Sequence, residues 1–348
     1  METIKRSFGM NRTSIEWTDY SWNPVTGCTK VSAGCRECYA ETMTRRFSKT
    51  WGYNFNQVRI HEDRLGEPYL QKKPSRIFVC DMSDLFHEAV PFKFIDLVFT
   101  QIARCRQHTF QVLTKRPDRL LEYFQSRDRM WQNERMQTLE ARLRYYAYQW
   151  DFYFDDPGNW IWPLPNLWIG TSCENQATAN LRIPQLMASP AAVHFVSCEP
   201  LLGRIDFDQV PRNRLHPWTL DWVIAGGESG HNARPMHPRW IRSIRDQCEA
   251  ADVPFFFKQW GEFLPLEFDA QPPYRQFACG GPVIDGHHIN VIDPDTDKPG
   301  LFQGKRFMEA MDAITFCVEE NESQCDFLHR GRSKFLPKLD DKYHKQFP

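Results

Sequence analysis

The sequence predicts an α/β protein built as a full or partial parallel β/α barrel. Short runs of β-branched and aromatic residues recur between residues 76 and 259, and each run ends in polar residues or glycine. Helical stretches separate several of these runs, as crossover connections between parallel strands require. The runs do not alternate strictly between apolar and polar residues, which is typical of strands buried on both faces. A doubly wound open sheet has the same local pattern and is the alternative.

The elements follow in a regular order. Six strands are predicted at residues 76–80, 109–113, 167–170, 194–196, 222–225 and 254–257. Helices are predicted over 94–104 and 119–124, directly after the first two of these strands. A further strand, the first of the sheet, is expected near residues 14–17. Together these units account for a full or partial barrel.

Two regions break this pattern and suggest the domain organisation. Residues 1–265 are predicted to form the barrel-like core, with a helical insertion near 126–162 that is rich in Arg, Gln, Tyr and Trp. Residues 266–348 are predicted to be an irregular C-terminal extension, with a hairpin within 267–300. Its tail, from 327 onward, is basic. Such a tail covers the site or binds an anionic partner, and a solvated arm is the alternative.

Composition narrows the class of protein. The 348 residues carry a formal charge of −1, so no global basic field points to nucleic acid, although a local groove is compatible with this value. The first 17 residues lack the apolar run of a secretory signal, and no stretch has the roughly 18 apolar residues of a membrane span. Eleven cysteines without an export signal predict a cytoplasmic protein whose cysteines are thiols, metal ligands or nucleophiles.

Three cysteines within eleven residues are the most informative motif. Cys28, Cys35 and Cys38 have six and then two residues between them, inside the segment 22–41. Three such thiolates hold three irons of a [4Fe–4S] cluster and leave the fourth iron open for another ligand. Gly27 and Gly34 precede two of the cysteines, where positive φ helps a short loop to turn. A zinc site completed by a distant His61 or Cys80, or three unrelated buried thiols, are the alternatives.

Polar residues follow the predicted strands at the point where each strand ends. In a barrel and in an open parallel sheet alike, the active site lies at these carboxyl ends. The candidates are Asp81, Asp84, Lys115, Glu174, Glu199, Glu228 and Lys258.

Several segments together resemble a known family. They are SIEWTD at 14–19 with CYAE at 38–41, DMSDLFH at 81–87, QVLTKRP at 111–117, SCEPLLG at 197–203, GGESG at 226–230 and FKQWG at 257–261. In this order they resemble the three-Cys-motif family of phages and prophages, which is similar to a branch of the radical S-adenosylmethionine (radical SAM) superfamily. The match spans most of residues 13 to 262. The spacing C-x6-C-x2-C is longer than the commonest spacing of that superfamily, C-x3-C-x2-C.

The resemblance implies a partial β/α barrel, a [4Fe–4S] cluster held by Cys28, Cys35 and Cys38, and reductive cleavage of S-adenosylmethionine at the open iron. It further implies that Tyr39 stacks on adenine, and that Asp81 and Ser83 receive the methionine amine. Ser172 and Glu174 are candidates for the ribose hydroxyls. The catalytic candidates are Asp84, Lys115, Glu199, Glu228 and Lys258. A reductant such as flavodoxin or ferredoxin and a partner protein from an adjacent gene are the implied protein partners.

Three functions are consistent with these features. The first is a radical SAM enzyme that acts on a nucleobase, a nucleotide or a nucleic acid, with Lys115, Arg116 and the basic tail as phosphate contacts. The second is a zinc-stabilised nucleic-acid-binding protein. The third is a metal-dependent hydrolase or nuclease that uses Asp81 and Asp84 with a divalent ion.

Overall fold

The computed structural model describes residues 10–125, 139–149, 162–211, 220–230, 232–266, 291–293, 298–299, 326–329, 338–339 and 342–348. The chain divides into two compact units. Unit 1 comprises the residues up to 172, with 180–197 and 211–221. Unit 2 comprises 173–179, 198–210 and the residues from 222 onward. None of the described helices has the length and the apolar character needed to cross a membrane.

Unit 1 contains a mostly parallel sheet. The strands β2 (Tyr20–Trp22), β5 (Arg76–Val79), β6 (Thr109–Thr114), β7 (Leu167–Ser172) and β8 (Val193–Cys198) pair in that order, each parallel to the next. A short strand β1 (Asn11–Arg12) pairs antiparallel with β2. The described parallel strands follow chain order without the reversal that defines a doubly wound sheet. This order confirms the predicted α/β class in the form of a partial β/α barrel.

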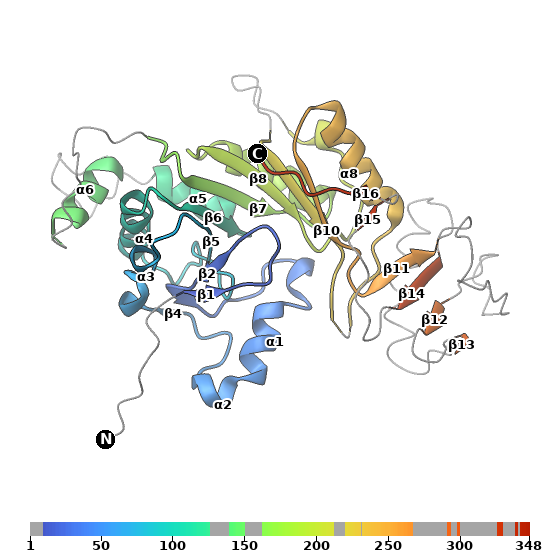
Figure 1. The fold of residues 1–348 in the computed structure, drawn as a ribbon, viewed down its shortest axis with the longest axis horizontal. Coiled ribbons are helices and arrows are strands. Elements are labelled where there is room, and N and C mark those ends of the chain that lie inside the picture. The colour runs from blue at the N-terminus through green and yellow to red at the C-terminus, as the bar shows by residue number, and fades with distance from the viewer. Residues whose placement is uncertain are drawn as a thin grey trace. The chain divides into compact units, whose positions relative to one another are not determined.

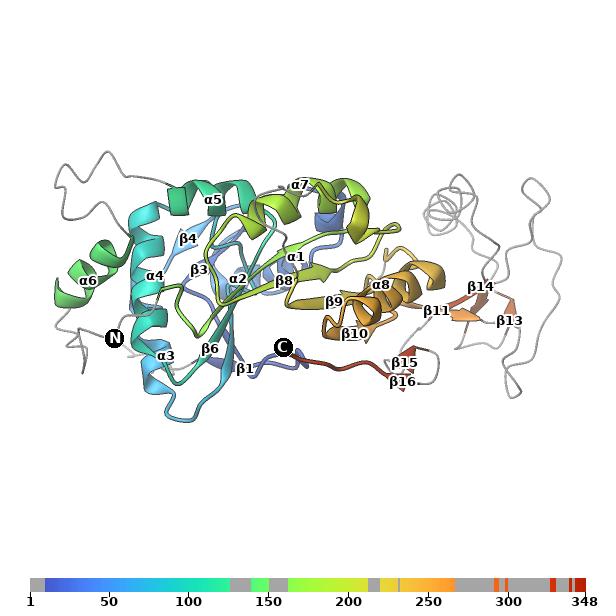
Figure 2. The same ribbon diagram turned by 90° about the horizontal axis from the view of Figure 1, so that it is seen from above.

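Helices cover the sheet of unit 1 because the strands are apolar on both faces. In β8 the consecutive residues Phe195 and Val196, which face opposite sides of the sheet, are both fully buried, whereas β5 alternates and buries Ile77 and Val79. The helix α4 (Phe92–Arg104) buries an apolar stripe that includes Phe94, Val98 and Ile102, at the spacing of one helix face. The helices α5 (Pro117–Gln125) and α7 (Gln176–Met187) follow β6 and β7. Figure 1 shows α4 beside β5 and β6, and Figure 2 shows α4 beside β6 from above.

The first strand lies further along the chain than predicted. Residues 14–17 form no strand, and Trp17 lies in a turn with its side chain buried. The first parallel strand is β2, whose Trp22 pairs with Val79 of β5. The prediction of a strand near 14–17 was wrong because β2 is three residues long and ends at Trp22, so it is too short to show a periodicity in the sequence.

The cysteine segment lies between two short strands of unit 1. After β3 (Val25–Thr26) come the 3₁₀ turn η1 (Ala33–Cys35) and the helices α1 (Tyr39–Arg46) and α2 (Ser48–Trp51). The chain then returns through β4 (Arg59–Ile60), which pairs antiparallel with β3. The turn η2 (Glu62–Arg64) and the helix α3 (Glu67–Leu70) lead on to β5. The cysteine loop, α1 and α2 therefore form one connection between the paired strands β3 and β4.

The predicted insertion contains the helix α6 (Leu139–Gln149), and residues 126–138 and 150–161 of that prediction lie outside the described residues. A buried ion pair joins α6 to α4, because Arg142 Nε lies 3.2 Å from Asp96 Oδ2. The hydroxyl of Tyr123 on α5 donates to Asp96 Oδ1 at 2.9 Å. These contacts make α6 part of the packed helical layer.

Unit 2 contains the parallel pair β9 (Trp222–Gly226) and β10 (Phe255–Gln259), with α8 (Pro238–Ala250) as their connection. The turn η4 (Phe207–Gln209) precedes them. Four short strands pair in the order β11 (Phe263–Leu266), β14 (Asp326–His329), β12 (Val291–Asp293) and β13 (Lys298–Pro299). The antiparallel pair β12–β13 lies within the predicted hairpin region 267–300. The domain boundaries at 265 and 266 stay a prediction.

The described end of the chain packs on β10. After β15 (Lys338–Leu339) and β16 (Lys342–Tyr343), the amide of Phe257 donates to the carbonyl of His344 at 2.7 Å. The amide of Gln346 donates to the carbonyl of Phe255 at 3.1 Å, and Lys345 forms an antiparallel bridge with Phe256. The last residues are thus an edge of the β9–β10 pair, which differs from the solvated arm that was the alternative for this tail.

Candidate functional site

Close backbone packing shapes the cysteine loop at its start. Gly27 has a φ of +83°, and a Cβ at this position would lie 2.3 Å from the carbonyl oxygen of Gln57. The amide of Cys28 donates to the carbonyl of Phe55 at 2.8 Å. Gly27 is therefore required for both conformation and space. Gly34 lies in the turn η1 and is not among the described glycines with positive φ, so that part of the prediction was wrong.

The three motif cysteines differ from the other described cysteines in exposure. Cys28, Cys35 and Cys38 are free and half-buried, whereas the other described cysteines are buried, namely Cys80, Cys105, Cys173, Cys198 and Cys248. Burial raises the pKa of Cys28 to about 11, and the Asp84 carboxylate acts in the same direction. Burial also raises the pKa of Cys38, which precedes the first residue of α1. Among the cysteines that the structure describes, the three motif thiols are thus the ones that are not buried.

The three motif cysteines do not by themselves complete a zinc site, which takes four ligands. Among the residues that the structure describes, no three His, Cys, Asp or Glu side chains are grouped as ligands of one metal ion, and this includes the motif cysteines. The predicted fourth ligands have other surroundings. His61 Nε2 lies 2.8 Å from Thr26 Oγ1, and burial raises the pKa of Cys80 to about 12.

A [4Fe–4S] cluster makes a different demand on the loop. Each cysteine binds a different iron, so the sulfurs surround a cubane and need not converge on one point. Cys28, Cys35 and Cys38 come from one loop, are free of disulfides and reach the surface. The donor set therefore fits a cluster with one open iron.

Arg116 links the cysteine loop to the ends of β5 and β6. Its Nη1 donates to Cys28 Sγ at 3.4 Å and to Asp84 Oδ2 at 3.2 Å. Its Nη2 donates to the carbonyl and to Oγ1 of Thr29 at 3.0 and 2.9 Å. Arg116 is 6% exposed, so this guanidinium is not available as the predicted phosphate contact.

Asp84 accepts hydrogen bonds from the loops that follow β5 and β6. Its Oδ1 accepts from the hydroxyl of Thr114 at 2.7 Å and from the amide of Phe86 at 3.0 Å. Its Oδ2 accepts from the amide of Lys115 at 3.0 Å and from Arg116. A carboxylate with four such donors is fully used in holding the loops.

His87 completes this network. Its Nδ1 accepts from the amide of Ala89 at 3.1 Å, which leaves the Nε2 hydrogen to be donated to Thr29 Oγ1 at 2.9 Å. Burial and the Arg116 charge lower the pKa of His87, which favours this neutral form.

Asp81 and Ser83 lie at the end of β5. Asp81 accepts from the hydroxyl of Ser21 at 2.9 Å and from the side-chain amide of Asn23. Burial raises the pKa of Asp81 although both bonds act in the opposite direction. Ser83 donates to the carbonyl of Val25 at 2.8 Å, so its hydroxyl hydrogen is already used.

Asp81 and Asp84 have separate sets of partners in the protein. This arrangement does not favour the paired-acid site that a hydrolase or nuclease would need.

Near this network Tyr39 offers an aromatic ring and Lys115 offers an ammonium group. The ring of Tyr39, the first residue of α1, is 59% exposed. Burial of its hydroxyl and the Asp81 charge raise the pKa of Tyr39, so the two residues interact electrostatically. Lys115 Nζ donates to Ser172 Oγ, at the end of β7, at 3.0 Å. The ends of β5, β6 and β7 in unit 1 thus carry a continuous set of polar groups that begins at the cysteine loop.

Four predicted site residues belong to unit 2. Lys258 Nζ lies 3.0 Å from Glu199 Oε1. Glu228 is 5% exposed and accepts from Nε of Arg234 at 2.8 Å and from the amide of Arg234 at 2.9 Å. Glu174 is 1% exposed. Their roles in a reaction stay a prediction.

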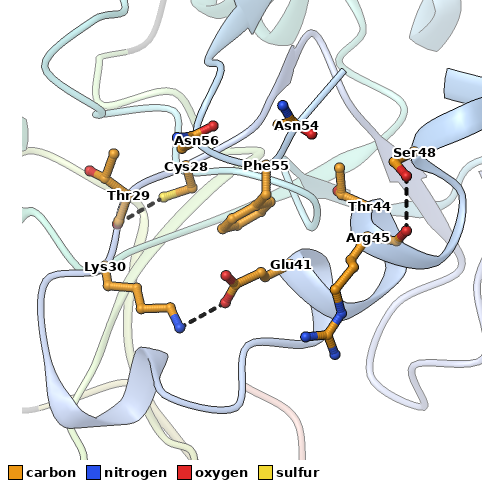
Figure 3. A pocket seen from close by; sticks show the side chains of 10 residues that line it. All are labelled: Cys28, Thr29, Lys30, Glu41, Thr44, Arg45, Ser48, Asn54, Phe55 and Asn56. Carbon is orange, nitrogen blue, oxygen red and sulfur yellow. Dashed lines mark hydrogen bonds and ion pairs between the residues drawn. The ribbon is translucent and has the colours of Figure 1, made fainter. Parts of the chain in front are cut away.

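A cavity of about 520 Å³ lies beside Cys28. Figure 3 shows its lining residues, which come from the loop 28–30, from α1 and α2 and from the turn 54–56. Phe55 lies among the polar side chains, and Lys30 Nζ is paired with Glu41 at 2.8 Å. Arg45 is exposed at the end of α1. The cavity therefore offers an aromatic ring, amides and a cation next to one motif sulfur.

Sequence reasoning missed the groups that anchor the loop. Thr29, His87 and the turn at 55–57 were not among the candidates, and Arg116 was assigned only as a phosphate contact. Arg116 directly follows Lys115 at a strand end, which was the available signal. Its partners Asp84 and Thr29 are 32 and 87 residues away in the chain.

A family model described as "Protein of unknown function (DUF5131)" matches residues 12–348. No curated protein matches the chain. Two structures of spore photoproduct lyase single mutants match with a TM-score of 0.38 and 13% identity, and the alignments cover 70% and 64% of this chain. A third, a double mutant with bound AdoMet and dinucleoside spore photoproduct, matches with a TM-score of 0.35, 11% identity and 74% coverage. The chain spans 64%, 59% and 60% of the lengths of those three structures, less than two thirds of each.

Proposed function

The chain belongs to the family described as protein of unknown function (DUF5131), and we propose that it is a radical SAM enzyme. Cys28, Cys35 and Cys38 would hold its [4Fe–4S] cluster. The observation that carries the proposal is the position of these free, half-buried thiols beside the polar ends of β5 and β6, linked through Arg116. The sequence motifs of the radical SAM-like family support the same assignment.

The group that Cys28, Cys35 and Cys38 would hold would supply the one electron needed to cleave S-adenosylmethionine into methionine and a 5′-deoxyadenosyl radical, and this radical would take a hydrogen atom from the substrate. The residues of unit 1 would position the reactants. The exposed ring of Tyr39 is suited to stacking on adenine. Asp81 would accept from the methionine amine, with Ser83 as its neighbour, and the Lys115–Ser172 pair offers a hydroxyl and an ammonium group.

The proposed substrate is a nucleobase, a nucleotide or a nucleic acid. The cavity beside Cys28 supports this class, because Phe55 offers a ring for base stacking and Asn54 and Asn56 offer amides for a base edge. The guanidinium of Arg45 has no hydrogen-bond or ion-pair partner among the described residues and is suited to a phosphate. Arg45 takes the place of the buried Arg116 as the proposed phosphate contact.

The direct test is anaerobic purification and reconstitution, followed by iron, sulfide and zinc analysis and an assay for 5′-deoxyadenosine with dithionite as reductant. About four irons per chain with cleavage are expected. Alanine at Cys28, Cys35 or Cys38 should remove both iron and cleavage. Cys105→Ala and Cys248→Ala are matched controls at buried thiols and should retain both. One zinc per chain without cleavage would overturn the proposal.

A further inference from the structure

We propose that Arg116 and Asp84 together set the reduction potential of the cluster, with Arg116 raising it and Asp84 lowering it. This inference rests on the proposed function, because it requires a cluster at the cysteine loop. Arg116 would act as a positioning residue through Cys28, since its Nη1 donates to Cys28 Sγ at 3.4 Å.

The geometry holds the guanidinium in place. Nη1 also donates to Asp84, Nη2 donates twice to Thr29, and Nε lies 3.3 Å from Glu88 Oε2. A side chain that is 6% exposed and has these partners keeps one orientation. Because an arginine stays protonated in proteins, the donor to Cys28 is permanent.

The charge arrangement determines the sign of the effect. One-electron reduction adds negative charge to the cluster and its sulfurs. A cationic donor to a ligand sulfur stabilises the reduced form and raises the potential, whereas a nearby carboxylate lowers it. Arg116 and Asp84 act in opposite directions on negative charge at Cys28, because one is a cation that donates to the sulfur and the other is the carboxylate beside that cation. Their balance decides which one-electron donor, of the flavodoxin or ferredoxin class, is able to reduce the cluster.

The experiment compares the reconstituted full-length protein with three variants, Arg116→Gln, Asp84→Asn and Arg119→Gln. Arg119 is the matched control, because it lies on α5 three residues further along and donates to the carbonyl of Val90 instead of a cysteine. Iron per chain is measured first. The midpoint potential is then measured by a redox titration followed by electron paramagnetic resonance.

Arg116→Gln should lower the ratio of reduced to oxidised cluster at the wild-type midpoint about tenfold, a shift of ~59 mV for one electron. Asp84→Asn should shift the midpoint upward, and Arg119→Gln should leave it unchanged. Opposite shifts at two buried neighbours are not expected from damage to the fold, which would reduce the iron content of both variants.

The outcomes separate this inference from the proposed function. A wild-type protein with no reducible cluster would overturn the proposed function and the inference with it. A wild-type cluster whose midpoint stays the same in Arg116→Gln and Asp84→Asn would overturn the inference alone. If Arg116→Gln loses iron, Asp84→Asn decides: a midpoint above that of the wild type supports the inference, and an unchanged midpoint overturns it.

Discussion

A Cβ atom on Gly27 would lie 2.3 Å from the carbonyl oxygen of Gln57, so the backbone before the first motif cysteine is in direct contact with the turn before β4. The amide of Cys28 donates to Phe55 in the same turn. The turn at 55–57 therefore holds the position of Cys28, although it lies almost thirty residues away in the chain.

Gly27→Ala should destabilise the cysteine loop. The positive φ costs ~1–2 kcal/mol for alanine, and the contact with Gln57 adds to this cost because backbone atoms have to move. Gly52→Ala is the control, because Gly52 also has a positive φ of 70° but has nothing within 4 Å of its Cβ position. Thermal unfolding and iron per chain are measured for both. Equal losses in the two variants would contradict the role of the Gln57 contact.

Asp81→Asn should separate stability from function. Because burial raises the pKa of Asp81, the stability that its protonated form contributes is fully present below the unfolded pKa and is lost as pH rises through the folded pKa. At neutral pH the asparagine variant should therefore be at least as stable as the wild type. As the pH falls, the free energy of unfolding of the wild type should rise relative to that of the variant.

The same variant should keep its iron but use S-adenosylmethionine less well, since an amide is a weaker acceptor for an ammonium group. Chemical denaturation at several pH values is compared with 5′-deoxyadenosine formation. Unchanged cleavage would remove Asp81 from the proposed cofactor contacts.

Glu228→Gln should destabilise unit 2, because it leaves Arg234 without its carboxylate. Removing one partner of a buried ion pair costs about 3–5 kcal/mol, and the partial exposure of Arg234, 14% for its side chain, places the expected loss at or below the lower end of that range. The double variant Glu228→Gln, Arg234→Met should recover part of this loss. Urea unfolding of Glu228→Gln, Arg234→Met and the double variant gives the interaction free energy between the two residues. Additive losses would mean that the pair contributes no interaction energy.

Removal of residues 342–348 should also destabilise unit 2. Four hydrogen bonds join this segment to the residues around β9 and β10, including one from Trp222 Nε1 to the carbonyl of Gln346 at 2.8 Å. At roughly 1 kcal/mol for each bond, the expected loss is on the order of 2–4 kcal/mol. Gln346→Ala removes only the side-chain acceptor of the Phe255 amide and should cost about 1 kcal/mol. Thermal unfolding measures both, and an unaffected truncation would show that the segment does not stabilise the β9–β10 pair.

The strands and helices were predictable where their pattern is local. The strand at 109–113 and the helix at 94–104 agree with β6 and α4, because unbroken apolar runs and a repeating apolar face each fit within a few residues. The first strand was missed for the same reason, since β2 has three residues and little pattern. The edge that residues 344–347 form is not predictable from the sequence, because their pairing with Phe255 and Phe257 does not depend on their composition.

In the candidate site too, the local features were predictable from the sequence and the long-range contacts were not. The spacing of Cys28, Cys35 and Cys38 marked the loop, because ligands of one centre are close together in the chain. Arg116 was assigned to phosphate on its charge alone, whereas the fold buries it against Asp84 and Cys28. The ion-pair partner of a charged residue depends on the tertiary fold, so the sequence alone does not identify it.

The sequence by itself determined the α/β class, the positions of most strands along the chain and the cysteine loop, because apolar periodicity and ligand spacing act over a few residues. The tertiary structure decided that the described sheet of unit 1 keeps chain order, and it decided which charges are neutralised. Arg116 pairs with Asp84, Arg234 with Glu228 and Lys258 with Glu199. Such pairs depend on which strand ends and loops meet, and on how far burial removes each charge from water. Neither quantity is present in the local pattern of a sequence.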